Sequence, residues 1–282
     1  MQALLCAADI RPSELVQLAD ALIPAELAGW RDELPIFVRP GKMIRARIVA
    51  ATAGVGGAVR EECVQIGALG VELLHEGSLI HDDVCDCSPA RRGLPSVPQR
   101  RGPRAAAWLG AAVLGWGLDL LAHVAGRCGI RLDLAFAVDA VEAQVLEVLP
   151  WDAEPEQQRR RYQEIVQGKT GALFRMACEL GGQLGGLCGA EREATRTFAE
   201  AFSLGFQVLD DVRDVEGGPQ LGKPAGGDLD RHLLTWPVLE WISHARELPS
   251  VPRDDANNLR AELARTGMLD RARSFAATQF DI

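Results

Sequence analysis

Apolar side chains recur along most of the chain at the three- and four-residue spacing of amphipathic helices, and strand-like alternation is nearly absent. The clearest run predicts one helix over residues 61–84. Further helices are expected over residues 14–27, 104–126, 132–149, from Pro155 past Gly168 toward 180, 193–214, 232–248 and 255–279. The pattern therefore predicts an all-α fold.

Composition narrows this picture without changing it. The 282 residues are 48% hydrophobic and contain no linker, low-complexity tract or fixed repeat, which favours a single domain over residues 1–282. The net charge of −9 argues against nucleic acid as a partner. Seven irregularly spaced cysteines indicate free thiols in a reducing cytoplasm, and the amino terminus does not have the pattern of a signal peptide.

The stretch 105–126 is long and apolar enough to be considered as a membrane span. Asp119 and His123 interrupt it, and polar ionisable groups are costly inside a bilayer. We therefore expect a buried core helix here and no transmembrane segment.

Two carboxylate triplets with the same spacing close two of the predicted helices. They are Asp82, Asp83 and Asp86, and Asp210, Asp211 and Asp214. In a helix the first and third members lie roughly 6 Å apart, where two such charges repel by roughly 3 kcal/mol at an effective dielectric constant of 20. Arginine or a divalent cation could supply the counter-charge, and carboxylates without His or Cys suit Mg²⁺. For a single motif of this kind a solvated helix end would be the better interpretation, because short acidic motifs are common.

Two pairs of basic residues lie elsewhere in the sequence. Lys42 and Arg45, three apart after Pro40-Gly41, are expected to share one face at a helix start, where cations gain nothing from the helix dipole. A bound anion would explain them, and so, about equally, would an ordinary basic surface. The adjacent Arg91 and Arg92 lie in a predicted loop and could reach two different anions.

A lysine lies among apolar residues in the helix that begins at Pro155. Lys169 shares its face with Tyr162, Val166 and Leu173, and a buried lysine requires a partner. The glycine-rich stretch 217–228 carries Lys223 and reads either as a flexible surface loop or as a lid that closes over a site. Together, the acidic and basic motifs suit metal-held diphosphates beside an apolar cavity, and hence ionisation of an allylic diphosphate.

In order and spacing these motifs resemble the trans-prenyltransferases, the head-to-tail isoprenyl diphosphate synthases or polyprenyl synthetase family. The resemblance runs from about residue 34 to 237. It is carried by Gly41-Lys42-x-x-Arg45, Leu79-Ile-His-Asp-Asp-Val-x-Asp86 with Arg91-Arg92-Gly93, Lys169-Thr170, Gly205-Phe-Gln-Val-Leu-Asp-Asp-Val-x-Asp214, Leu221-Gly-Lys223, Gly227-Asp-Leu229 and Thr235-x-Pro237.

The resemblance implies a single-domain, all-α helical bundle around a deep central cavity, a homodimer, and three Mg²⁺ ions. It implies that the two acidic triplets form the metal-binding motifs, with Asp82 and Asp86 holding two ions and Asp210 the third. The remaining roles it implies are allylic diphosphate binding by Arg91, Lys169 and Lys223, isopentenyl diphosphate binding by Gly41, Lys42, Arg45, His75 and Arg92, and contact with the reacting carbons by Thr170 and Gln207.

The residues before the first acidic motif bear on product length. In the family, bulk at the fourth and fifth positions before this motif shortens the product, and this chain has Ser78 and Gly77 there. Small residues imply an open pocket and a prenyl diphosphate of about C15–C20 or longer. Trp108 and Trp116, on a neighbouring predicted helix, could set the pocket floor instead, although aromatic residues on such a helix are more often plain core.

Three other readings stay open. Met43 and Leu233 stand where the family usually has basic residues, which motivates a class I terpene synthase that acts on an allylic diphosphate alone. A non-catalytic partner subunit of a prenyl synthase is a second alternative, although six clustered acids would have no use in it. An acidic protein-interaction scaffold would show no Mg²⁺-dependent diphosphate binding.

Overall fold

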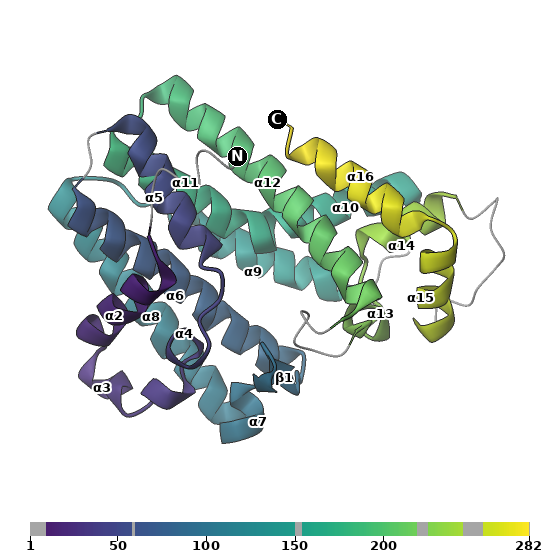
Figure 1. The fold of residues 1–282 in the computed structure, drawn as a ribbon, viewed down its shortest axis with the longest axis horizontal. Coiled ribbons are helices and arrows are strands. Elements are labelled where there is room, and N and C mark those ends of the chain that lie inside the picture. Colours follow the sequence, from purple (N-terminus) through teal and green to yellow (C-terminus); the bar gives the residue numbers. More distant parts are fainter. Residues whose placement is uncertain (1–9, 58–59, 150–153, 219–224, 245–255, 282) are drawn as a thin grey trace. The chain divides into compact units, whose positions relative to one another are not determined.

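The computed structural model describes residues 10–57, 60–149, 154–218, 225–244 and 256–281 (Figure 1). The chain divides into two compact units. One comprises Met1–Asp133 with Leu173–Arg196, and the other comprises Leu134–Ala172 with Thr197–Ile282. The prediction of one domain over residues 1–282 stays a prediction.

The first unit is built around two long helices, α6 (Glu61–Cys85) and α8 (Pro103–Cys128), which pack against each other. Its other elements are α2 (Pro12–Leu22), α3 (Ala25–Ala28), η1 (Arg31–Glu33), α4 (Pro35–Val38), α5 (Ile44–Gly56), β1 (Ala90–Arg91), β2 (Leu94–Pro95), α7 (Val97–Arg101), nearly all of α11 (Ala172–Gly185) and the start of α12 (Gly189–Glu216). Apart from the short hairpin β1–β2, every element in the described part of the chain is helical, so the all-α prediction is confirmed.

Glycines let α6 and α8 approach closely. A Cβ atom on Gly77 would lie 2.8 Å from Cγ of Leu114 and 3.0 Å from the carbonyl oxygen of Gly110. Gly77 is therefore a position of close packing between α6 and α8, and the expectation that it opens a product pocket stays a prediction. Trp108 is 71% exposed, which argues against it as a pocket floor, whereas Trp116 is buried.

The second unit contains α9 (Ala135–Val148), α10 (Pro155–Val166), η2 (Gln167–Gly171), most of α12, α13 (Gly227–Asp230), α14 (Trp236–Ser243), α15 (Ala256–Arg265) and α16 (Met268–Gln279). Trp236 is central to its core. The indole stacks on Phe275 with ring centroids 3.9 Å apart and meets Tyr162 edge-on at 5.5 Å. These contacts join α14 to α16 and α10, and so fix the buried side of the unit.

Several predicted helices are broken by local backbone chemistry. The helix expected over residues 14–27 ends at Leu22, because Pro24 disfavours helical geometry at Ile23 before it. The segment 255–279 is split at Gly267, which adopts a left-handed φ of 76°. The segment from Pro155 toward 180 is interrupted by η2, a π-helical turn of the kind that often marks functional sites.

Among the described residues, one helix passes a length and composition test for a membrane span. This is α8, of which 44% of the most apolar window is buried. Core helices of soluble proteins pass the same test, and α8 packs along α6, as expected for a core helix. The expectation of no transmembrane segment stays a prediction.

Candidate active site

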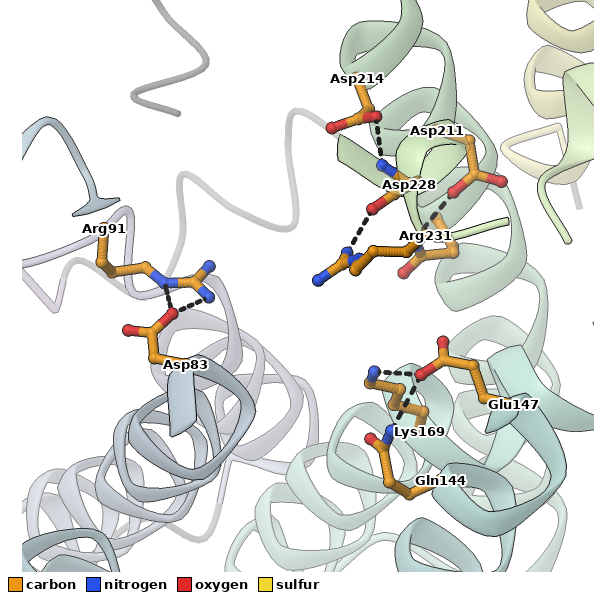
Figure 2. Close-up of polar contacts among 10 residues, drawn as sticks. Asp83, Arg91, Gln144, Glu147, Lys169, Asp211, Asp214, Asp228 and Arg231 are labelled. Atoms are coloured by element: carbon orange, nitrogen blue, oxygen red, sulfur yellow. Dashed lines mark hydrogen bonds and ion pairs between the residues drawn. The ribbon is translucent and has the colours of Figure 1, made fainter. Parts of the chain in front are cut away.

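The first acidic motif ends α6, and its three carboxylates have different surroundings. Asp83 is buried, and its Oδ1 accepts hydrogen bonds from Nε of Arg91 at 3.0 Å and from Nη2 at 2.5 Å (Figure 2). Asp82 and Asp86 are only half-buried. Burial alone would lower the pKa of Arg91, but the hydrogen bond and charge of Asp83, with the charges of Asp82 and Asp86, raise it. Asp83 is thus committed to Arg91, whereas Asp82 and Asp86 face solvent in part.

Arg91 and Arg92 lie at the tip of the β1–β2 hairpin. Arg91 pairs with Leu94, so Arg92 and Gly93 form a two-residue turn, with φ values of 52° and 77°. Two positive φ angles are the mark of a type I′ turn, which is unusual for an arginine. Arg92 donates from Nη2 to Oε1 of Glu76 on α6 at 2.6 Å. As expected, the two adjacent arginines reach two different anions, but both anions are carboxylates of α6.

Arg45 is buried rather than displayed beside Lys42. Met43 adopts a left-handed φ of 49° and caps α5, so Lys42 precedes the helix and is exposed. Arg45 is 8% exposed, and its guanidinium carbon lies 4.5 Å from the ring centroid of Phe174. The prediction that Lys42 and Arg45 share one helix face is therefore wrong, because the backbone turns at Met43 before the helix begins.

Arg45 belongs to a buried charged cluster between α5 and α6. Burial raises the pKa of Glu72 to about 7, although the charge of Arg45 lowers it, and Oε2 of Glu72 accepts a hydrogen bond from the Ala46 amide at 3.4 Å. Burial, with the charges of the neighbouring arginines, holds the pKa of His75 well below its usual range. His75 is therefore neutral at pH 7, where it can donate or accept a hydrogen bond but adds no charge.

The second acidic motif lies in the part of α12 that belongs to the second unit. Asp211 is buried and accepts hydrogen bonds from the Tyr162 hydroxyl at 2.7 Å, the Trp236 amide at 2.9 Å and Nε2 of Gln207 at 3.0 Å. Burial raises the pKa of Asp211 to about 7, against the lowering effect of these hydrogen bonds. Like Asp83, the middle acid of this motif is therefore held by protein groups.

The outer acids of the second motif differ from each other. Asp210 is exposed, whereas Asp214 is buried and its Oδ2 accepts a hydrogen bond from the Asp228 amide at 3.0 Å. Asp228 pairs in turn with Arg231 at 2.7 Å. Asp228 thus adds a fourth acid beside this motif, and sequence reasoning assigned it no role, although Gly227-Asp-Leu229 was one of the resembling motifs (Figure 2).

Lys169 has the partner that its sequence position requires. Its Nζ lies 2.7 Å from Oε2 of Glu147 on α9, and Nε2 of Gln144 donates to the same oxygen at 3.0 Å (Figure 2). Gly168 makes this possible, since a Cβ atom there would lie 2.6 Å from the carbonyl oxygen of Asp139 on α9. Sequence reasoning missed Gln144 and Glu147, whose only signal was a polar pair three residues apart on a largely apolar helix.

Thr170 and Gln207 are brought together as the resemblance implies. The Thr170 hydroxyl donates to Oε1 of Gln207 at 2.8 Å, and Gln207 donates in turn to Asp211. The η2 turn is therefore linked by hydrogen bonds to α12 within the second unit. Lys223, the remaining candidate, lies outside the described residues.

Each acidic motif fits a metal that takes its other ligands from a substrate. Among the described residues, no group of three or more His, Cys, Asp or Glu side chains gathers closely enough to hold an ion. Mg²⁺ is typically bound by one or two carboxylates together with water and substrate phosphates. The two outer acids of the first motif and exposed Asp210 are carboxylate donors of this kind, so the donor set suits Mg²⁺ bound together with a diphosphate.

A family model described as polyprenyl synthetase matches residues 34–260. The geranylgeranyl diphosphate synthase of Mycobacterium tuberculosis is 32% identical over 226 residues, which cover 78% of this chain and 64% of that protein. Heptaprenyl diphosphate synthase component 2 of Geobacillus stearothermophilus is 29% identical over 277 residues, covering 95% of this chain and 82% of that protein. This chain thus spans less than two thirds of the mycobacterial protein and most of the second relative.

Solved structures agree with the fold. A decaprenyl diphosphate synthase from Rhodobacter capsulatus matches with a TM-score of 0.80 and 24% identity, covering 98% of this chain and 89% of that chain. A polyprenyl synthase from Caulobacter crescentus, solved with calcium and isoprenyl diphosphate, matches with a TM-score of 0.77 and 25% identity, covering 96% of this chain and 89% of that chain.

Proposed function

Because this chain belongs to the polyprenyl synthetase family, we propose that it is a Mg²⁺-dependent head-to-tail prenyltransferase. It would condense isopentenyl diphosphate with an allylic diphosphate to a prenyl diphosphate of about C15–C20 or longer. The observation that carries the proposal is the division of labour within each acidic motif. Asp83 and Asp211 are buried and held by protein groups, while Asp82, Asp86 and Asp210 are more exposed to solvent.

Three Mg²⁺ ions are proposed, two held through Asp82 and Asp86 and one through Asp210. Mg²⁺ held by these carboxylates would supply the positive charge that stabilises the leaving diphosphate. The Caulobacter structure that holds calcium and isoprenyl diphosphate supports a metal–diphosphate site in this family. Asp214 and Asp211 would support the motif through their hydrogen bonds to the Asp228 and Trp236 amides.

The protein's own cations would complete binding of the allylic diphosphate. Arg91 is oriented by Asp83, and Lys169 by Glu147, so both cations are preorganised for an anion. Lys223 is proposed as a third contact on the basis of the resemblance. The Thr170 hydroxyl and the Gln207 amide, hydrogen-bonded to each other, would place oxygen dipoles toward the developing carbocation.

The co-substrate would be isopentenyl diphosphate, bound by Gly41, Lys42, Arg45, His75 and Arg92. Neutral His75 fits a hydrogen-bonding role, and exposed Lys42 is accessible to an anion. Arg45 would act at longer range, because it is buried. The relatives named as farnesyl, geranylgeranyl and octaprenyl diphosphate synthases support condensation with products of about C15–C20 or longer.

A homodimer is proposed, with α9 at its interface. Four valines spaced three, four and three residues apart are 53–71% exposed: Val138, Val141, Val145 and Val148. An exposed apolar stripe of this kind on a helix is typical of a contact surface. A cytoplasmic location is proposed from the free thiols among the described residues, and the acidic net charge favours no nucleic-acid partner.

Two alternatives rest on particular observations. Met43 is 2% exposed and belongs to the core, so it adds no cation for isopentenyl diphosphate, which favours a class I terpene synthase. The similarity to a protein named heptaprenyl diphosphate synthase component 2 favours a subunit that requires a partner chain. In either case, the partly solvent-exposed outer carboxylates of the first acidic motif favour metal binding.

A product assay separates these readings. Purified protein is incubated with Mg²⁺ and each allylic diphosphate of increasing length, with and without isopentenyl diphosphate, and the extract is analysed before and after phosphatase treatment. We expect a longer prenyl alcohol that requires isopentenyl diphosphate, phosphatase and Mg²⁺, and that disappears with EDTA. A hydrocarbon or cyclic alcohol formed without isopentenyl diphosphate would establish the terpene synthase instead, and no turnover would favour the partner subunit.

A further inference from the structure

Arg92 is held on three sides by the first unit itself. Its Nη2 donates to Oε1 of Glu76 at 2.6 Å, and its Nη1 donates to the carbonyl oxygen of Arg39 at 3.0 Å. A Cβ atom on Gly41 would lie 2.8 Å from Nη2, so the guanidinium rests directly on the Gly41 backbone. Arg92 also keeps a left-handed φ of 52°, which a non-glycine residue adopts only where its surroundings hold it.

Glu76, the carboxylate that holds Arg92, needs the charge of Arg92 in return. The Glu76 side chain is 2% exposed, and its Oε2 has no hydrogen-bond partner among the residues that the structure describes. A buried carboxylate with one satisfied oxygen needs its counter-ion, because removing one partner of a buried ion pair leaves an uncompensated charge. An anion approaching Arg92 must therefore share the guanidinium with Glu76 or draw it away.

We propose that Glu76 is an internal counter-ion that competes with isopentenyl diphosphate for Arg92 and so sets a weak affinity for that substrate. This inference rests on the proposed function, in which Arg92 binds isopentenyl diphosphate. Glu76 acts through Arg92 as a positioning residue, since it keeps the guanidinium in place and lowers its net attraction for the diphosphate. A second buried acid, Glu72, lies in the field of Arg45 and Arg92.

The decisive variant is Glu76→Gln, which keeps an oxygen acceptor for Arg92 and removes the charge. We expect the KM for isopentenyl diphosphate to fall roughly five- to tenfold, the size of one ordinary net hydrogen bond, without a matching fall in the KM for the allylic diphosphate. A residue that only held Arg92 in place would give an unchanged or raised KM instead. The comparison is made at saturating allylic diphosphate.

A matched control exists in the same unit. Glu33 is also a buried carboxylate, and it pairs with two arginines, Arg100 and Arg101. Glu33→Gln removes a charge of the same kind and is expected to leave the KM for isopentenyl diphosphate at the wild-type value. A second test introduces Glu76→Gln into an Arg92→Gln background. There the fall in the KM for isopentenyl diphosphate should vanish, because the guanidinium for which Glu76 and the diphosphate compete is gone.

The outcomes separate this inference from the proposed function. If wild type condenses and Glu76→Gln has an unchanged or higher KM for isopentenyl diphosphate, Glu76 is not a competitor. If neither forms a product that requires isopentenyl diphosphate, the proposed function fails. Condensation by the variant alone would support the competitor and show that wild type does not use isopentenyl diphosphate. Glu76→Thr provides a second neutral variant, and unfolding of both variants would assign Glu76 to the fold and overturn the inference.

Discussion

The buried side chain of Glu72 is expected to make the stability of the first unit depend on pH. Burial raises its pKa from 4.5 to about 7. The groups that act on it are Arg45 and the Ala46 amide from α5, Glu76 one turn along α6, and Arg92 from the hairpin. Two acids and two arginines therefore share this buried space, and a proton on Glu72 changes their balance of charge.

The sign of the effect follows from proton binding. Between about pH 4.5 and 7 the folded chain keeps a proton on Glu72 that the unfolded chain has released, so the free energy of unfolding falls as pH rises. As pH rises from 5 to 8, we expect the free energy of unfolding of Glu72→Gln to increase by about 1–3 kcal/mol relative to that of wild type. Denaturant titrations at each pH measure this.

A control on the same helix makes that measurement specific. Glu61 is exposed at the start of α6, and Glu61→Gln should show the wild-type dependence on pH. A Glu72→Gln variant with a wild-type pH profile would contradict a raised pKa at Glu72.

The middle acids show where residue-level reading of the sequence stops. The resemblance placed all six acids of the two triplets in metal-binding motifs. The partners of Asp83 and Asp211 come from the hairpin, α10 and α14, up to 49 residues away in the chain for Tyr162. A motif records which residues recur, but burial and hydrogen-bond partners depend on the tertiary structure.

At the scale of elements, the periodicity of α6 was sufficient to predict it almost to the residue, since 61–84 was expected and Glu61–Cys85 is observed. The start of α5 and the π turn at η2 could not be predicted. Met43 has no side-chain signal for a left-handed conformation, and η2 lies within a continuous helical pattern. The sequence pattern reports which residues are apolar, whereas these breaks are stabilised by packing.

Close packing of α6 and α8 gives the prediction at this scale. Gly77→Ala would place its Cβ 3.0 Å from the Gly110 carbonyl, a backbone atom that cannot rotate away. We expect a net loss of about 1–2 kcal/mol, because overpacking exceeds the better helix propensity of alanine. Thermal or denaturant unfolding measures the loss.

The matched control lies on the facing helix. Gly115 of α8 is exposed, and a Cβ atom there would meet nothing within 4 Å. Gly115→Ala should therefore leave stability unchanged or raise it by up to about 1 kcal/mol. If Gly77→Ala is as harmless as Gly115→Ala, the close helix contact does not explain the glycine.

At the scale of the whole molecule, the exposed valines of α9 bear on assembly. The resemblance implied a homodimer, and the valine stripe is an exposed apolar surface of the kind found at interfaces. A two-fold axis would place the same stripe of two copies face to face, which buries both at once. The sequence pattern of α9 gave no sign of which face would be covered, since its apolar residues are spread around the helix.

A charge within this stripe should therefore separate the copies. We expect wild type to elute as a dimer and Val141→Glu or Val145→Glu to elute as a monomer, because a buried unpaired carboxylate at an interface is costly. Size-exclusion chromatography with light scattering measures the mass directly. Val55, 56% exposed on α5, provides the control, and Val55→Glu should remain a dimer. A monomeric wild type, or dimeric Val141→Glu and Val145→Glu variants, would show that α9 is not the interface.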